Sequence, residues 1–153
     1  MEAGYFFQSM MFDIKVGEDQ ETNPGCYGQV LAEWLCEKLK AYYPDADVVP
    51  EDWGWCVMCS CEDFLLWVGC GAMQTEESLA HYDEKAPPKG EAVVWHAFPH
   101  VEVPFFMFET RFRQWTGAID LDGPLKELDT RLQTILNSEE RIQFCEQPEN
   151  SFH

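Results

Sequence analysis

The stretch EDWGWCVMCSCEDFLLWVGCGA, residues 51–72, decides the fold, because it holds three of the six tryptophans and four of the seven cysteines. It predicts two strands joined by a two-residue turn at Glu62 and Asp63. This turn pairs Trp55 with Cys70, Val57 with Val68, Cys59 with Leu66 and Cys61 with Phe64. Both faces of the hairpin are then largely apolar, which indicates strands covered on both sides or a sheet with a partner on its second face.

One set of residues in and after this stretch could hold a metal: Cys56, Cys59, Cys61, Cys70, His96 and His100. A structural zinc site needs four thiolate or imidazole ligands that converge tetrahedrally. On a strand, however, Cys56 and Cys59 point to opposite faces, and Cys70 lies roughly 13 Å along the hairpin from Cys59. We therefore predict no metal and no cofactor, and we interpret the thiols as core residues. A small cysteine-dependent or zinc-binding enzyme remains the alternative.

Apolar patterns on both sides of the hairpin predict further elements. The expected elements are a strand at 5–16, a helix at 24–43, a turn at 45–50 that leads into a short extended piece, a strand at 91–98, a second extended piece bracketed by Pro99 and Pro104, a helix at 124–137 and an edge strand at 141–145. Asn23 is the expected N-cap of the first helix, and Pro24 suits its first position. Residues 73–89 predict an exposed excursion with room for one short helix at 76–82. The dense apolar run at 105–108 is either core or a contact patch.

Together these elements predict a single globular domain, residues 1–153, with a frayed tail from about residue 148. The predicted fold class is α+β in two layers, an antiparallel sheet of five to six strands with two main helices packed against it. No catalytic motif stands out, because the chain has neither a G-x-S-x-G elbow nor a glycine-rich phosphate loop with its lysine. An enzymatic role is therefore not favoured.

Charge is the strongest global signal. Twenty-eight acidic against ten basic residues give a net charge of −18. Nucleic acids and anionic membrane surfaces would be repelled, whereas a cationic protein partner would be attracted and steered into contact. Solubility alone is the other explanation of this charge. The sequence shows no signal peptide and no apolar run of membrane length, and its seven cysteines are an odd number. These observations predict a reducing, cytoplasmic location.

Clustered carboxylates beside aromatic residues are what an inhibitor of a basic enzyme needs, because aromatics anchor a complex and charges steer it. One cluster is expected at 45–52, a second at the hairpin turn and a third at 76–77, with a further group at Glu18, Asp19 and Glu21. The candidate partner-binding residues are Asp45, Asp47, Glu51, Asp52, Glu62, Asp63, Glu76 and Glu77. Ordinary solvated loops would have a similar composition.

Three motifs carry a resemblance: Asn23-Pro24-Gly25-x-Tyr27-Gly28, Glu51-Asp52-Trp53-Gly54-Trp55 and Leu66-Trp67-Val68-Gly69-Cys70-Gly71. They look like those of small bacterial cytosolic proteins. In size, acidity and aromatic content the chain also resembles immunity proteins of bacterial toxin systems, including those paired with type VI secretion effectors. The resemblance implies a stoichiometric inhibitor that blocks a cationic toxin, and a homodimer through the second face of the hairpin sheet is compatible with it. An acidic inhibitor that mimics nucleic acid is a further alternative.

Overall fold

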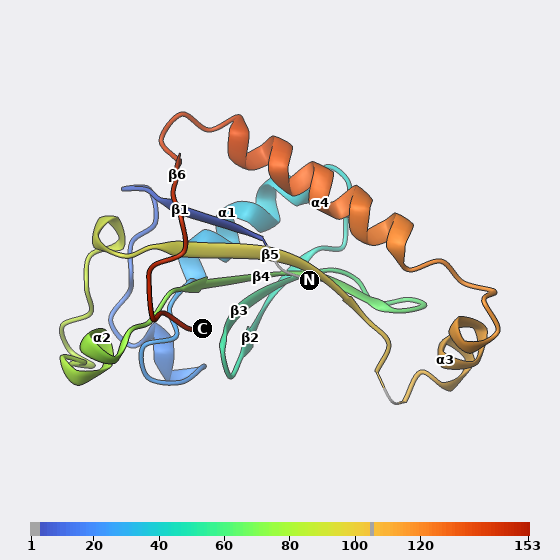
Figure 1. Ribbon diagram of the computed structural model, residues 1–153, viewed down its shortest axis with the longest axis horizontal. Helices are drawn as coiled ribbons and strands as arrows, with labels where there is room; N and C mark the ends of the chain where they lie inside the picture. The colour runs from blue at the N-terminus through green and yellow to red at the C-terminus, as the bar shows by residue number, and fades with distance from the viewer. Residues whose placement is uncertain (1–3, 105) are drawn as a thin grey trace.

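The computed structural model describes residues 4–104 and 106–153, and its centre is one antiparallel sheet of six strands in the order β2-β3-β4-β5-β1-β6 (Figure 1). The strands are β1 (Tyr5–Gln8), β2 (Asp47–Glu51), β3 (Gly54–Ser60), β4 (Leu65–Ala72), β5 (Trp95–Glu102) and β6 (Gln143–Phe144). The helices are α1 (Gln29–Leu39), α2 (Glu76–Ala80), α3 (Phe108–Trp115) and α4 (Asp122–Asn137), with short 3-10 turns η1 (Glu18–Gln20) and η2 (Gly90–Ala92). The predicted α+β class is confirmed, since α1 and α4 share one core with the sheet.

The core lies between one face of the sheet, here called the covered face, and the helices α1 and α4. Alternation along β3 and β4 sends Val57 and Val68 to this face, where both are fully buried. Leucines repeat every fourth residue on both helices and have no exposed surface: Leu31, Leu35 and Leu39 on α1, and Leu128, Leu132 and Leu136 on α4. Full burial of one such side chain contributes about 1.5–3 kcal/mol relative to leaving it in water.

The hairpin follows the predicted register over most of its length and departs from it near the tip. Trp55 pairs with Cys70 and Val57 with Val68, as the pattern predicts. The ladder then shifts by one residue, so Ser60 rather than Cys59 faces Leu66, and the predicted pairing of Cys59 is wrong. The extra residue makes a β-bulge at Cys59. Residues 61–64 form the connection in place of a two-residue turn.

Helix α1 begins five residues later than predicted, because its N-terminus is capped from a distant segment. The Glu18 carboxylate accepts hydrogen bonds from the backbone N–H groups of Gly28 (2.8 Å) and Gln29 (3.0 Å). Asn23, the expected cap, instead donates its side-chain amide to the carbonyl of Asp52. Gly28 has a φ of 145°, and a Cβ there would lie 2.9 Å from a carbonyl oxygen of β4, so glycine is required at this boundary.

Two other strand boundaries also differ from the sequence pattern. β1 ends at Gln8, and Phe12 reaches the core from the following loop. β5 runs through Pro99, which was expected outside the strand. β1 pairs only with residues 95–97 of β5, so the N–H that proline lacks at Pro99 falls beyond that ladder.

The opposite face of the sheet, here called the open face, carries aromatic rings and the end of the chain. The C-terminal segment crosses β5 and β4 on this side (Figure 1), and Phe152 exchanges two backbone hydrogen bonds with Gln74. The His153 ring lies over Gly71, where a Cβ would approach it to 2.7 Å. It also contacts Trp53 and His96, with ring centroids 6.0 and 4.7 Å away. The tail expected to fray from about residue 148 is thus anchored at its end.

Candidate partner-binding site

The most exposed aromatic side chains of the described residues belong to one short segment at the end of the molecule. Figure 1 shows α3 set apart from the sheet and from the other helices. Four side chains form what we call the aromatic ridge: Phe106 (69% exposed), Phe108 (67%), Phe112 (60%) and Trp115 (83%). The last three follow helical spacing and therefore share one side of α3. Thr110 is the buried residue of this helix.

Local signals explain why α3 forms despite its position. The backbone N–H of Met107 bonds to the carbonyl of Pro104, and Gly117, with a φ of 78°, ends the helix. Arg113 lies in the last turn, where the helix dipole stabilises its positive charge. Its guanidinium also forms an ion pair of 3.2 Å with the carboxylate of Asp63 at the hairpin tip. The run at 105–108 was left open between core and contact patch. Phe106 and Phe108 are surface residues, while Phe105 lies outside the described residues.

The structure divides the predicted acidic cluster at 45–52 into two parts, because β2 separates its ends. Asp47 pairs with Met58 near the end of β3, whereas Glu51 pairs with Gly54 at its start. Asp45 therefore lies at the same end of the hairpin as Glu62, and both line a depression of about 260 Å³. We call the carboxylates at this end the acidic rim: Asp45, Asp47, Glu62 and Asp63. The ion pair to Arg113 joins this rim to α3.

The remaining candidate acidic residues lie elsewhere. Glu51 and Asp52 are exposed at the other end of β2. Glu76 and Glu77 occupy the first turn of α2, where the helix dipole favours negative charge. These four residues lie away from the rim, so sequence proximity and shared composition did not predict which carboxylates lie at the same end of the hairpin.

Two of the acidic residues between β1 and α1 have structural roles that composition did not reveal. Glu18 and Asp19 are only 4% and 5% exposed, so they are not part of a solvated loop. Glu18 caps α1, while Asp19 accepts hydrogen bonds from the N–H of Gly25 (3.0 Å) and the hydroxyl of Tyr82 (2.7 Å). Buried carboxylates are retained when such donors satisfy them. Glu18 also accepts the N–H of nearby Lys15 (2.8 Å), but its donors on α1 and the donors of Asp19 are 6 to 63 residues away, beyond the reach of a local pattern.

The cysteines are distributed through the core and do not assemble into a site. Five are buried, while Cys61 and Cys145 are exposed. Burial raises the pKa of both Cys56 and Cys59 to about 12, so these thiols stay protonated near neutral pH. Within residues 4–104 and 106–153, no three His, Cys, Asp or Glu side chains are grouped to hold a metal ion.

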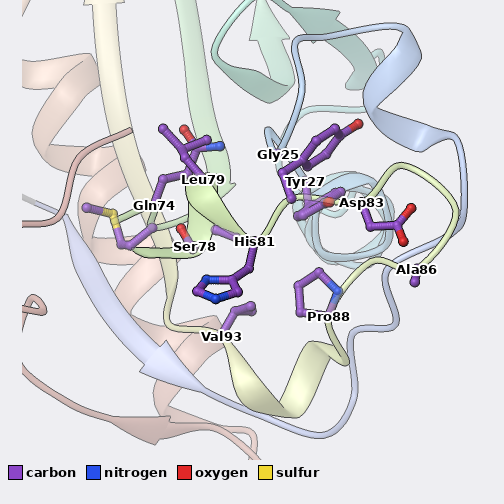
Figure 2. Close-up of a pocket in the computed structure, with 13 residues that line it drawn as sticks. Gly25, Tyr27, Gln74, Ser78, Leu79, His81, Asp83, Ala86, Pro88 and Val93 are labelled. Atoms are coloured by element: carbon purple, nitrogen blue, oxygen red, sulfur yellow. The ribbon is translucent and has the colours of Figure 1, made fainter. Parts of the chain in front are cut away.

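A separate cavity of about 240 Å³ opens beside α2 (Figure 2). Residues from the loop that precedes α1, the end of β4, α2 and the segment between α2 and β5 line it. Figure 1 places α2 and α3 at opposite ends of the long axis of the molecule. The cavity and the aromatic ridge are therefore independent candidate sites.

No protein-family model matches this chain, and neither the curated proteins nor the solved structures include a match. The class that the fold defines is an α+β protein with one helix-covered sheet face and a projecting aromatic helix. In the part of the chain that the structure describes, no helix has the length and apolar character needed to cross a bilayer.

Proposed function

We propose that this protein is a non-enzymatic binding module, an immunity protein that inhibits a cationic bacterial toxin by direct contact. The observation that carries the proposal is the aromatic ridge, whose four side chains are 60–83% exposed beside the acidic rim. A surface of this composition is typical of protein interfaces, in which buried aromatic anchors supply most of the binding energy.

The short length of α3 supports a role in contact. An isolated helix of eight residues is marginal in water, and most helices are stabilised by packing of an apolar face. In α3 that face is the aromatic ridge, which is exposed. A partner that covers Phe112 and Trp115 would stabilise the helix and remove this apolar surface from water.

Charge indicates which kind of partner fits. The rim carboxylates lie beside the ridge, and the chain has a net charge of −18. Arg113 of α3 is already paired with Asp63. A cationic toxin would therefore be steered towards this end of the molecule, with its basic residues near the rim and an apolar groove over the ridge.

The alternative of a cysteine-dependent enzyme has less support. A nucleophilic thiol requires a lowered pKa, whereas burial raises the pKa of Cys56 and Cys59. A zinc-binding domain would need converging ligands, which the described residues do not provide.

The test uses the product of a gene adjacent to the one that encodes this chain, provided that the product is basic. Co-expression should protect cells from that product, and the purified proteins should bind with one-to-one stoichiometry. Replacing both Phe112 and Trp115 with serine should weaken binding by roughly 30-fold or more, as expected for two anchors. Adjacent genes that encode no basic product, or full protection by the double variant, would contradict the proposal.

Two matched controls separate the ridge from general surface effects. Met10 and Val16 are also exposed, at 71% and 66%, and their replacement with serine should leave binding unchanged. Reversing the charge of Asp45 and Glu62 to lysine should slow association at low salt. The same reversal at Glu76 and Glu77, on α2 at the far end, should have a smaller effect because those charges lie away from the interface.

A further inference from the structure

The cavity beside α2 has the walls of a small-molecule site. Most of its lining is apolar: Ala72, Met73, Leu79, Ala86, Pro88 and Val93, together with the aromatic residues Tyr27 and Tyr82. Its volume of about 240 Å³ equals that of roughly eight liquid water molecules at ~30 Å³ each. A bicyclic aromatic ring with a short side chain fits a space of this size. Apolar concave walls with a few converging polar groups are characteristic of ligand sites.

Hydrogen bonding fixes the tautomer of the histidine in this cavity. Figure 2 shows the imidazole of His81 among the lining side chains, with Val93 and Pro88 drawn around it. Its Nδ1 lies 2.9 Å from the carbonyl oxygen of Glu77. A carbonyl oxygen can only accept, so Nδ1 carries the hydrogen. In the neutral ring Nε2 is then a hydrogen-bond acceptor.

The other polar side chains of the cavity either are already engaged or carry negative charge. The hydroxyl of Ser78 takes part in the capping box of α2, and the amide of Gln74 donates to the carbonyl of Pro24. The Asp83 carboxylate accepts the N–H of Lys85 and is otherwise exposed, so it can accept further hydrogen bonds. The hydroxyl of Tyr82, a residue of the cavity wall, donates a hydrogen bond to the buried carboxylate of Asp19. The cavity thus presents acceptors and negative charge.

We propose that this cavity binds a small aromatic cation, a bicyclic ring that carries an N–H donor and an ammonium group. The ring would lie against Tyr27, Leu79 and Val93, where apolar and aromatic contact favours a flat ligand. Its N–H would donate to Nε2 of His81, and its ammonium would lie near the carboxylate of Asp83. The net charge of −18 favours such a ligand over an anion of the same shape.

Tryptamine is the probe, and indole-3-acetate is its control, since it keeps the ring and reverses the charge. Isothermal titration of the full chain should show saturable one-to-one binding of tryptamine. Indole-3-acetate should bind at least tenfold more weakly. The proposal is overturned if tryptamine does not saturate, or if the two compounds bind equally well.

Three variants locate the binding. Ala86→Trp fills the cavity from an exposed position, so it should abolish tryptamine binding without disturbing the core. His81→Phe removes the acceptor and Asp83→Asn removes the charge, and each should weaken binding several-fold. Glu109→Gln, at an exposed position of α3 at the opposite end of the molecule (Figure 1), is the matched control and should bind tryptamine as the unaltered protein does. Binding that survives Ala86→Trp would overturn the assignment of this cavity, and it would leave the proposed toxin contact at α3 unaffected.

Discussion

Helices α4 and α3 are near neighbours along the chain and carry the same kind of apolar stripe, but only one stripe is covered. Leu128, Leu132 and Leu136 repeat every fourth residue and are completely buried. Phe108 and Phe112 have the same spacing and are 67% and 60% exposed. Apolar spacing therefore predicts a helix and its apolar side, while what covers that side depends on distant parts of the chain.

The largest effect is expected where the stripe is covered. Leu132→Ala should lower the free energy of unfolding by about 2–5 kcal/mol, because the side chain is fully buried and its removal leaves a cavity. Urea unfolding followed by circular dichroism measures this change. A loss below about 1 kcal/mol would show that α4 does not pack on the sheet as described.

Buried and exposed carboxylates should also differ in how much they contribute to stability. Glu18→Gln should destabilise the fold by about 1–3 kcal/mol, because it removes a buried charged acceptor from the N–H groups of Gly28 and Gln29. Glu62→Gln is the matched change at an exposed site and should alter stability by less than about 0.5 kcal/mol. Equal effects at the two positions would argue against the long-range cap.

Sequence patterns were sufficient where neighbours along the chain are also neighbours in space. They predicted α4 almost to its ends and the hairpin register as far as Met58. They failed at the bulge of Cys59, since an inserted residue leaves no mark on alternation. They also missed α3, because a phenylalanine-rich run after Pro104 has the composition of a strand.

The candidate site was less predictable than the fold. Asp45 and Glu62 belong to different segments and line the same depression only because β2 pairs with β3 in antiparallel register. Glu51 is closer to Asp45 in the sequence but lies at the other end of the strand. The role of Glu18 depends on donors ten and eleven residues away. Such contacts are consequences of tertiary structure and have no local signature.

A smaller, pH-dependent effect is expected at the C-terminal segment, which covers part of the open face. Burial, with a contribution from neighbouring His96, lowers the pKa of His153 from 6.5 to about 4. The released tail therefore binds a proton below about pH 6.5, whereas the anchored tail does not until about pH 4. Anchoring should be fully present above pH 6.5 and should weaken as the pH falls towards 4. Hydrogen exchange at the amide of Phe152 measures this.

His153→Phe provides the control for that titration, because it keeps an aromatic ring and removes the ionisable group. In this variant the exchange rate, corrected for the intrinsic effect of pH, should no longer rise between pH 6.5 and 4. The same rise in the variant and in the unaltered protein would show that His153 does not control the tail.

The smallest effect on stability is expected at the aromatic ridge, and it gives the sharpest test of the comparison. Trp115 is 83% exposed, so Trp115→Ala should change the free energy of unfolding by less than about 0.5 kcal/mol. Urea unfolding of the Trp115→Ala and Leu132→Ala variants under the same conditions measures the change in free energy of unfolding for each. A loss of 2 kcal/mol or more at Trp115 would mean that the ridge packs against the protein itself or a second copy. A near-zero change, together with weakened toxin binding, would mean that the ridge is kept exposed for a partner, because nothing in the folded monomer would then depend on it.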